Sequence, residues 1–141
     1  MSAAMKIRCL YNKLIPVTEL KRHPKNRNKH PPDQIRRLAE ILRYQGWRYP
    51  IKISNLSGFI TSGHGRLDAA ILNEWKEIPV NFQDYESEDQ EYADIQADNA
   101  IALWAEFNLS GVNMDIPGLS SDFNINLLGL KYVDNLSAKK L

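Results

Sequence analysis

The feature that most constrains the fold is a glycine turn, residues 62–66 (Ser-Gly-His-Gly-Arg), between a β-prone run and a helical pattern. Residues 59–60 before the turn are typical of a strand, and Leu67, Ala70 and Ile71 after it repeat on one helical face. A strand that ends in a glycine turn and opens a helix gathers free backbone N–H groups and the positive end of the helix dipole at one point. The turn therefore predicts an anion site.

Each residue of this turn suits a phosphate ligand. Gly63 and Gly65 let the backbone approach a ligand without a Cβ in the way, and Arg66 offers a planar fork of donors. His64 can donate to a phosphate or act as a general acid or base near neutral pH. A purely structural interpretation also exists, in which the glycines form a turn, Arg66 is solvated and His64 bonds the backbone. The residues alone leave both interpretations open.

The rest of the chain predicts an α+β fold, a small mixed β-sheet with packed helices. Short β-prone runs lie at residues 15–17, 51–53, 59–60 and 78–82. Apolar residues repeat at helical spacing over residues 35–42, and Gly46 ends that pattern. Ser87 and Gln90 fit a capping box, which begins a long helix that runs to about residue 107.

The length of 141 residues suits one domain plus tails. We expect the domain over residues 12–108, followed by a C-terminal extension, residues 109–141, with one short helix at residues 123–130. No apolar run approaches a membrane span and the first residues lack a secretory signal, so we expect a cytoplasmic protein. Cys9, the single cysteine, allows neither an internal disulfide nor a cysteine-based zinc site.

A basic loop, residues 21–30, precedes the first helical pattern. It holds five lysines and arginines and two asparagines, and such a segment can grip a phosphate chain or fold over a bound nucleotide. A mobile, solvated loop is the alternative. His23 and His30, which lie in this loop, are interpreted as loop polar residues, and the spacing of the three histidines predicts no metal site.

Charge and aromatic residues leave further alternatives open. Residues 1–52 hold 13 lysines and arginines against three acids, a local charge of +10, whereas residues 53–141 hold 5 against 14, a local charge of −9. This split indicates an anionic partner for the basic part, or two halves that neutralise each other, or both. We expect four aromatic residues in the core or at its edge: Trp47, Tyr49, Trp75 and Trp104.

Several segments, taken in order, resemble the ParB N-terminal/sulfiredoxin superfamily over about residues 14–108. The most specific is residues 62–70, in its place between strand and helix. The matching turn reads Gly-Glu-Arg-Arg and binds the triphosphate of CTP in ParB-type proteins, and reads Gly-Gly-Cys-His-Arg and binds ATP in sulfiredoxins. Gly63 and Arg66 match both patterns, whereas His64 replaces the catalytic cysteine of sulfiredoxins, so sulfiredoxin chemistry is not expected.

The long helix carries a partial match to a second motif of the superfamily. Asn99 falls on the asparagine of the Glu-Asn-x-x-Arg motif of ParB-type proteins, with Asp98 and Ala102 in place of the glutamate and arginine. The Gly-His-Gly-Arg variant of the turn is most similar to ParB-like domains that phages encode alone or ahead of DNA methyltransferases. Either a free-standing domain or the first piece of a longer protein fits this resemblance.

The resemblance implies a nucleotide-binding domain that takes ATP or another nucleoside triphosphate with accompanying Mg²⁺, with or without hydrolysing it. The domain would act on or near DNA and work with a DNA methyltransferase or another phage protein. The nucleotide would be bound by Gly63, Gly65, Arg66 and Asn99, with Asn26, Arg27 and Asn28 closing over it and His64 as the catalytic residue. DNA would be bound by Lys21, Arg22, Lys25 and Lys29. Two alternatives remain, a ParB-like nuclease and a non-catalytic module that binds DNA or protein. No carboxylate cluster of a metal nuclease is evident.

Overall fold

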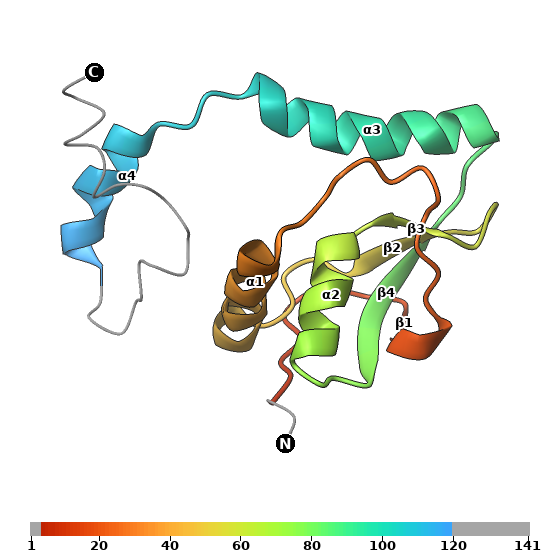
Figure 1. Cartoon of the computed structure of the whole chain (residues 1–141), viewed down its shortest axis with the longest axis horizontal. Helices are drawn as coiled ribbons and strands as arrows, with labels where there is room; N and C mark the ends of the chain where they lie inside the picture. Colours follow the sequence, from red (N-terminus) through yellow and green to blue (C-terminus); the bar gives the residue numbers. More distant parts are fainter. Residues whose placement is uncertain (1–3, 120–141) are drawn as a thin grey trace.

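The computed structural model of the chain describes residues 4–119. The strands are β1 (Lys13–Pro16), β2 (Ile51–Ser54), β3 (Ile60–Ser62) and β4 (Glu77–Gln83). The α-helices, labelled in Figure 1, are α1 (Pro32–Gln45), α2 (His64–Leu72), α3 (Glu88–Trp104) and α4 (Leu109–Asp115). Two short 3-10 helices cover Val17–Glu19 and Ile116–Gly118. The predicted helix at residues 123–130 lies outside the described residues.

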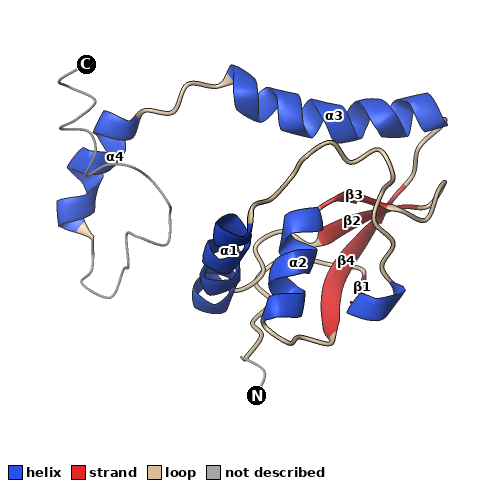
Figure 2. Ribbon diagram, in the orientation of Figure 1, coloured by secondary structure: helices blue, strands red, loops and turns tan. Residues whose placement is uncertain are grey.

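The sheet is mixed, as the sequence predicted, with the strand order β1-β4-β2-β3. Strands β2 and β3 form an antiparallel hairpin, β1 pairs antiparallel with β4, and β4 runs parallel to β2. Helices α1 and α2 pack against each other beside the sheet (Figure 2), and α3 extends as a long helix away from them. The predicted α+β fold class is confirmed.

The hydrophobic core lies between the sheet and the pair α1 and α2. Ile51, Ile60, Ile78 and Val80 from the strands are fully buried, together with the tryptophan Trp47. Trp47 lies against the buried Trp75, with 6.1 Å between ring centroids, so two of the four aromatic residues occupy the core as expected.

The expectation for the other two aromatic residues is wrong. Tyr49 is 71% exposed and Trp104 is 76% exposed, because Tyr49 lies in the connection before β2 and Trp104 at the free end of α3. Neither position lies between the sheet and the helices.

Local sequence signals set the helix ends. Pro32 occupies the first turn of α1, where a missing N–H costs nothing. Gly46 ends α1 with φ at 77°, and a Cβ there would lie 2.8 Å from the Lys6 carbonyl oxygen, so only glycine fits. Ser87 caps α3 as predicted, by accepting a hydrogen bond from the Gln90 N–H, while the Gln90 side chain accepts from the N–H of Glu86 rather than of Ser87.

The N-terminal segment contributes packing that the sequence did not predict. Ile7 forms an isolated parallel bridge with Trp47, and Met5, Ile7 and Cys9 pack against the core. Among residues 4–119, no helix is both long enough and apolar enough to cross a membrane.

Candidate functional site

The turn between β3 and α2 has the geometry of an anion site. Gly63 adopts a left-handed conformation with φ at 105°, and a Cβ there would lie 2.9 Å from Arg66 Nη2. Glycine is therefore required at this position. No side chain caps the start of α2, and the N–H groups of a first helical turn have no acceptor within the helix. These groups point outwards, at the positive end of the helix dipole.

Arg66 lies in the first turn of α2 and folds back along the turn rather than into solvent. One of its terminal nitrogens, Nη2, donates to the Pro50 carbonyl oxygen at 3.1 Å, while Nε is buried with no hydrogen-bond partner among the described residues. Burial lowers the pKa of the Arg66 guanidinium, and the groups that oppose this are Cys9 and Tyr49, not a carboxylate. The fold therefore holds a partly desolvated cation without an acidic partner.

His64, the first residue of α2, is buried and accepts a hydrogen bond at Nε2 from the His23 backbone N–H at 3.0 Å. Burial, and after it the nearby Arg22, lower the pKa of His64 from 6.5 to about 4. The ring is neutral at neutral pH, and its remaining donor is Nδ1–H. The expectation that His64 changes charge near neutral pH is wrong for this fold, because the charged ring would be desolvated beside other cations.

A cavity of about 400 Å³ opens beside the turn, a volume in the usual range for small-molecule sites. Its apolar wall comes from α1 and includes Leu38, Ile41 and Leu42. Seven residues predicted for the nucleotide site line it, namely Asn26, Asn28, Gly63, His64, Gly65, Arg66 and Asn99. Arg27, the remaining one, is exposed and is not among the lining residues.

The basic loop of residues 21–30 passes beneath α3, as Figure 1 shows, and is attached to it by polar contacts. Asn28 donates to Asn99 Oδ1 at 2.6 Å, and Gln96 donates to the Lys25 carbonyl oxygen at 3.1 Å. Lys25 also lies over the ring of Tyr92, 5.7 Å from its centroid. These contacts attach the loop to α3 beside the cavity, while most of the loop residues are exposed to solvent.

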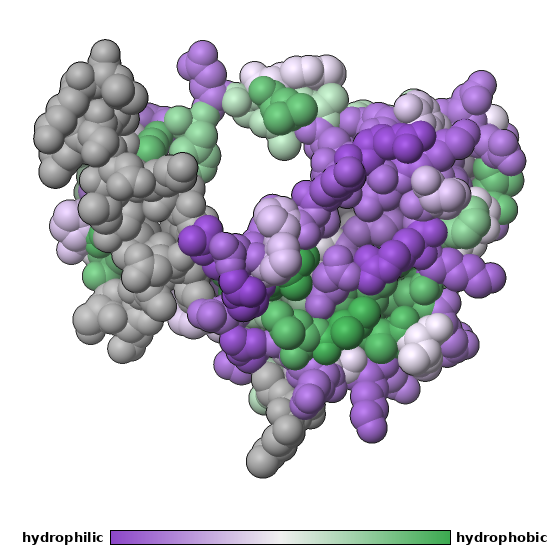
Figure 3. All heavy atoms as spheres, in the orientation of Figure 1, coloured by the Kyte–Doolittle hydropathy of each residue, from purple (hydrophilic) through white to green (hydrophobic). Residues whose placement is uncertain are grey.

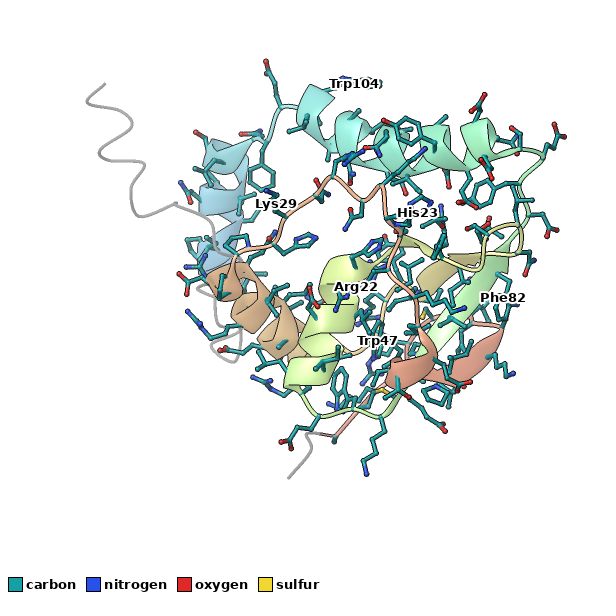
Figure 4. The ribbon with its side chains drawn as sticks, turned by 45° about the vertical axis from the view of Figure 1, so that its right-hand side comes forward. Arg22, His23, Lys29, Trp47, Phe82 and Trp104 are labelled. Carbon is teal, nitrogen blue, oxygen red and sulfur yellow. The ribbon has the colours of Figure 1, made fainter. Side chains whose placement is uncertain are left out.

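The four residues predicted to bind DNA, Lys21, Arg22, Lys25 and Lys29, are all exposed. Arg22 forms an ion pair with Asp68 of α2 at 2.5 Å. Figure 4 shows Arg22 over α2 and Lys29 farther along the same loop, and Figure 3 shows mainly hydrophilic side chains where the loop passes beneath α3.

His23 anchors the basic loop from inside the protein. Both His23 and Glu91 are buried, and His23 Nε2 lies 2.9 Å from Glu91 Oε2. The other carboxylate oxygen of Glu91 accepts a hydrogen bond from the Ser57 hydroxyl at 2.9 Å. Burial raises the pKa of the Glu91 carboxyl, but hydrogen bonds from Ser54, His23 and Ser57 outweigh burial and lower it. The interpretation of His23 as a loop polar residue is therefore wrong: the side chain ties the loop to α3, just beneath which it lies in Figure 4.

Sequence reasoning missed several residues that line the cavity, among them His30, Arg48, Tyr49 and Thr61. Asp98, which stands in place of the glutamate of the Glu-Asn-x-x-Arg motif, also lines it and lies 3.8 Å from Lys52 Nζ. None of these residues belongs to a local motif, and the fold brings them together from separate elements. Among the described residues, no group of three or more histidine, cysteine, aspartate or glutamate side chains could hold a metal ion.

Comparison with known proteins relates the chain to a curated protein and to solved structures. No protein-family profile matches the sequence. The chain is 34% identical over 65 residues to the ParB-like nuclease domain-containing protein YnaK of Escherichia coli (strain K12). The matched segment covers 46% of this chain and 74% of that protein.

Among the solved structures with a similar fold are two ParB structures. One is the C-terminally truncated chromosome-partitioning protein ParB from Caulobacter crescentus complexed with CTP-gamma-S, with a TM-score of 0.57 and 20% identity, over 69% of this chain and 56% of that chain. The other is a Pnob8-like ParB-N domain, with a TM-score of 0.52 and 21% identity, over 65% of this chain and 38% of that chain. The chain therefore spans about half of the first solved chain and less of the second.

Proposed function

Because this chain belongs to the ParB-like domain family, we propose that it binds a nucleoside triphosphate at the first turn of α2 and acts on or near DNA. The phosphates would lie at the start of α2, and the nucleoside would extend along the apolar wall of α1. Association with phages or DNA-modification systems is part of the same proposal.

The observation that carries this proposal is the state of Arg66. Its guanidinium is largely removed from water, has no carboxylate partner among the described residues, and lines a cavity together with the uncapped start of α2. A buried charge without a partner is costly. An anionic group in the cavity would satisfy both the cation and the free N–H groups.

Each residue then has a role in the proposal. Gly63 and Gly65 keep the turn clear of side chains, and Arg66 bonds phosphate oxygens. His64 would act as a neutral donor through Nδ1, which polarises a phosphate rather than exchanging a proton with it. The asparagines Asn26, Asn28 and Asn99 would contact the ligand, and Arg27 would reach it only when the loop closes further.

ATP is our first candidate for the nucleotide, and CTP is the second because the similar Caulobacter crescentus structure is complexed with CTP-gamma-S. Mg²⁺ would be held mainly by triphosphate oxygens, as is usual for this ion. Asp98 is the one acid among the residues that line the cavity, and a single carboxylate cannot supply all the ligands of a Mg²⁺ ion. The cavity therefore fits an ion that takes most of its ligands from the triphosphate. Bound there, Mg²⁺ would neutralise phosphate charge.

For DNA, we propose that Lys21, Arg22, Lys25 and Lys29 contact the phosphate backbone. They are exposed on a loop that α2 and α3 hold in place, so a DNA strand could bind without ordering the loop first. A DNA methyltransferase or another phage protein would be the partner that uses this binding.

A nuclease is the second candidate, favoured by the name of the Escherichia coli relative. One experiment tests all of these activities: radiolabelled ATP and CTP, and supercoiled plasmid DNA, are each incubated with the protein with and without Mg²⁺. Nucleotide binding or hydrolysis without DNA cleavage supports our proposal. Mg²⁺-dependent nicking supports the nuclease, and DNA binding alone supports a non-catalytic module.

A further inference from the structure

His30 lies closer to the phosphate-binding turn than any sequence pattern indicates. Three atoms of its ring would lie 3.3 to 3.4 Å from a Cβ placed on Gly65, so the ring packs directly against the second residue of α2. His30 also lines the cavity. The absence of a side chain at Gly65 is what lets the ring come this close to the start of the helix.

The ring of His30 is held from a second side by α1. Its Nδ1 atom lies 2.9 Å from Gln34 Oε1, and because that oxygen is only an acceptor, Nδ1 carries the proton of this hydrogen bond. No described residue bonds the other nitrogen, Nε2. A ring fixed by Gln34 and Gly65 loses little conformational freedom when a ligand binds.

We propose that His30 is a further phosphate-binding residue of this site and that it takes up one proton from solution as the nucleotide binds. The inference rests on the proposed nucleotide function. With its proton on Nδ1, a neutral His30 can only accept a hydrogen bond at Nε2. A phosphate oxygen is also an acceptor, so the lone pair of Nε2 would repel it. A proton added to Nε2 turns that atom into a charged donor, and histidine is the side chain that gains a proton most readily near neutral pH.

Charged and titratable groups line the cavity together with His30, namely Asp98 of α3, Arg66 and His64 of α2, and Arg48, after α1. A triphosphate bound there would bring negative charge to the ring of His30, which favours a protonated ring. Burial lowers the pKa of His64 to about 4, so His64 stays neutral near neutral pH.

Isothermal titration of Mg²⁺-ATP at pH 7.5, in two buffers of different ionisation enthalpy, measures both affinity and the number of protons exchanged. The variants are His30→Gln, which removes the titratable ring, and Gln34→Leu, which removes only its anchor. Arg37→Gln is the matched control, because it removes one positive charge from an exposed position of α1 outside the cavity. Thermal melts report whether each variant folds.

We expect His30→Gln to weaken binding about ten-fold, the size of one charge-assisted hydrogen bond, and to lose the proton uptake of the wild type. Gln34→Leu should weaken binding less and keep the uptake, and Arg37→Gln should match the wild type. If His30→Gln keeps the affinity and proton uptake of the wild type while Arg66→Met weakens binding, the inference is wrong and the nucleotide site stands. If the wild type binds neither ATP nor CTP, the proposed function and the inference fail together.

Discussion

Replacing Arg66 with methionine should remove most of the nucleotide affinity and leave the fold at least as stable as the wild type. The two effects have one cause, the placement of a cation inside the protein without an acidic partner. Methionine keeps part of the apolar stem of Arg66 but carries no charge and removes the guanidinium, which lies beside Gly63. The substitution therefore separates the ligand-binding role of this position from its packing role.

The magnitudes follow from the geometry. A charge-assisted hydrogen bond contributes about 1.5 to 3 kcal/mol, and about 1.4 kcal/mol corresponds to a ten-fold change in affinity. With Nη2 on the Pro50 carbonyl oxygen, Arg66 still has donors for one or two phosphate oxygens. Arg66→Met should thus weaken binding about ten-fold to a hundred-fold or more. Arg66→Lys should give an intermediate loss, because lysine keeps the charge without the planar fork.

Calorimetry of the wild type, Arg66→Met and Arg66→Lys against ATP and CTP measures the first effect, and thermal melts measure the second. We expect Arg66→Met to change the melting temperature by no more than a few degrees, and upwards, because the lost hydrogen bond to the Pro50 carbonyl oxygen offsets part of the gain from removing a desolvated charge. Equal affinities of the three proteins would refute the phosphate-binding role. A large fall in the melting temperature of Arg66→Met would show instead that this position serves the fold.

Three other predictions follow from the described contacts. The pKa of His64 is lowered to about 4 in the folded protein, so between about pH 6.5 and 4 the unfolded chain binds a proton at His64 that the folded chain does not. The melting temperature should therefore fall as the pH drops through this range. The fall should be smaller in His64→Gln. Glu91→Ala leaves His23 and Ser57 without their buried partner and should lower the free energy of unfolding by about 3 kcal/mol, measured by urea denaturation. Neutralising the loop cations Lys21, Arg22, Lys25 and Lys29 should make the slope of log K for DNA binding against log salt concentration shallower by about 0.9 per lost phosphate contact. An unchanged slope would exclude the loop as the DNA contact.

Much of the fold could be predicted because its signals are local. The proline pair at the start of α1, Gly46 at its end and the Ser87 cap of α3 each act within a few residues. The same is true of the turn at Gly63, where the left-handed backbone fits only glycine. The family resemblance was also predicted, since it depends on this turn and its place between a strand and a helix.

Residues that act over long sequence distances could not be predicted in this way. His23 and His30 look alike in the sequence, as polar residues among prolines, yet one is buried against Glu91 of α3 and the other packs on Gly65 of α2. Tyr49 and Trp104 were expected in the core because large aromatic residues are usually buried, but the ends of elements leave them exposed. Such outcomes depend on which elements pack together, and no single segment encodes that.

The uneven charge of the chain illustrates how the two initial interpretations combine. Ion pairs join the basic first part to the acidic remainder, as in Arg22 with Asp68 and Lys52 with Asp94, so the halves do neutralise each other in part. Arg66 belongs to the acidic part, which holds 14 carboxylates over residues 53–141. None of the described ones contacts it, although nearby acids pair with cations of the basic part. The acids near the surface are thus paired with other cations, and the inward-facing guanidinium of Arg66 has no acidic partner. A bound anion would neutralise this remaining positive charge.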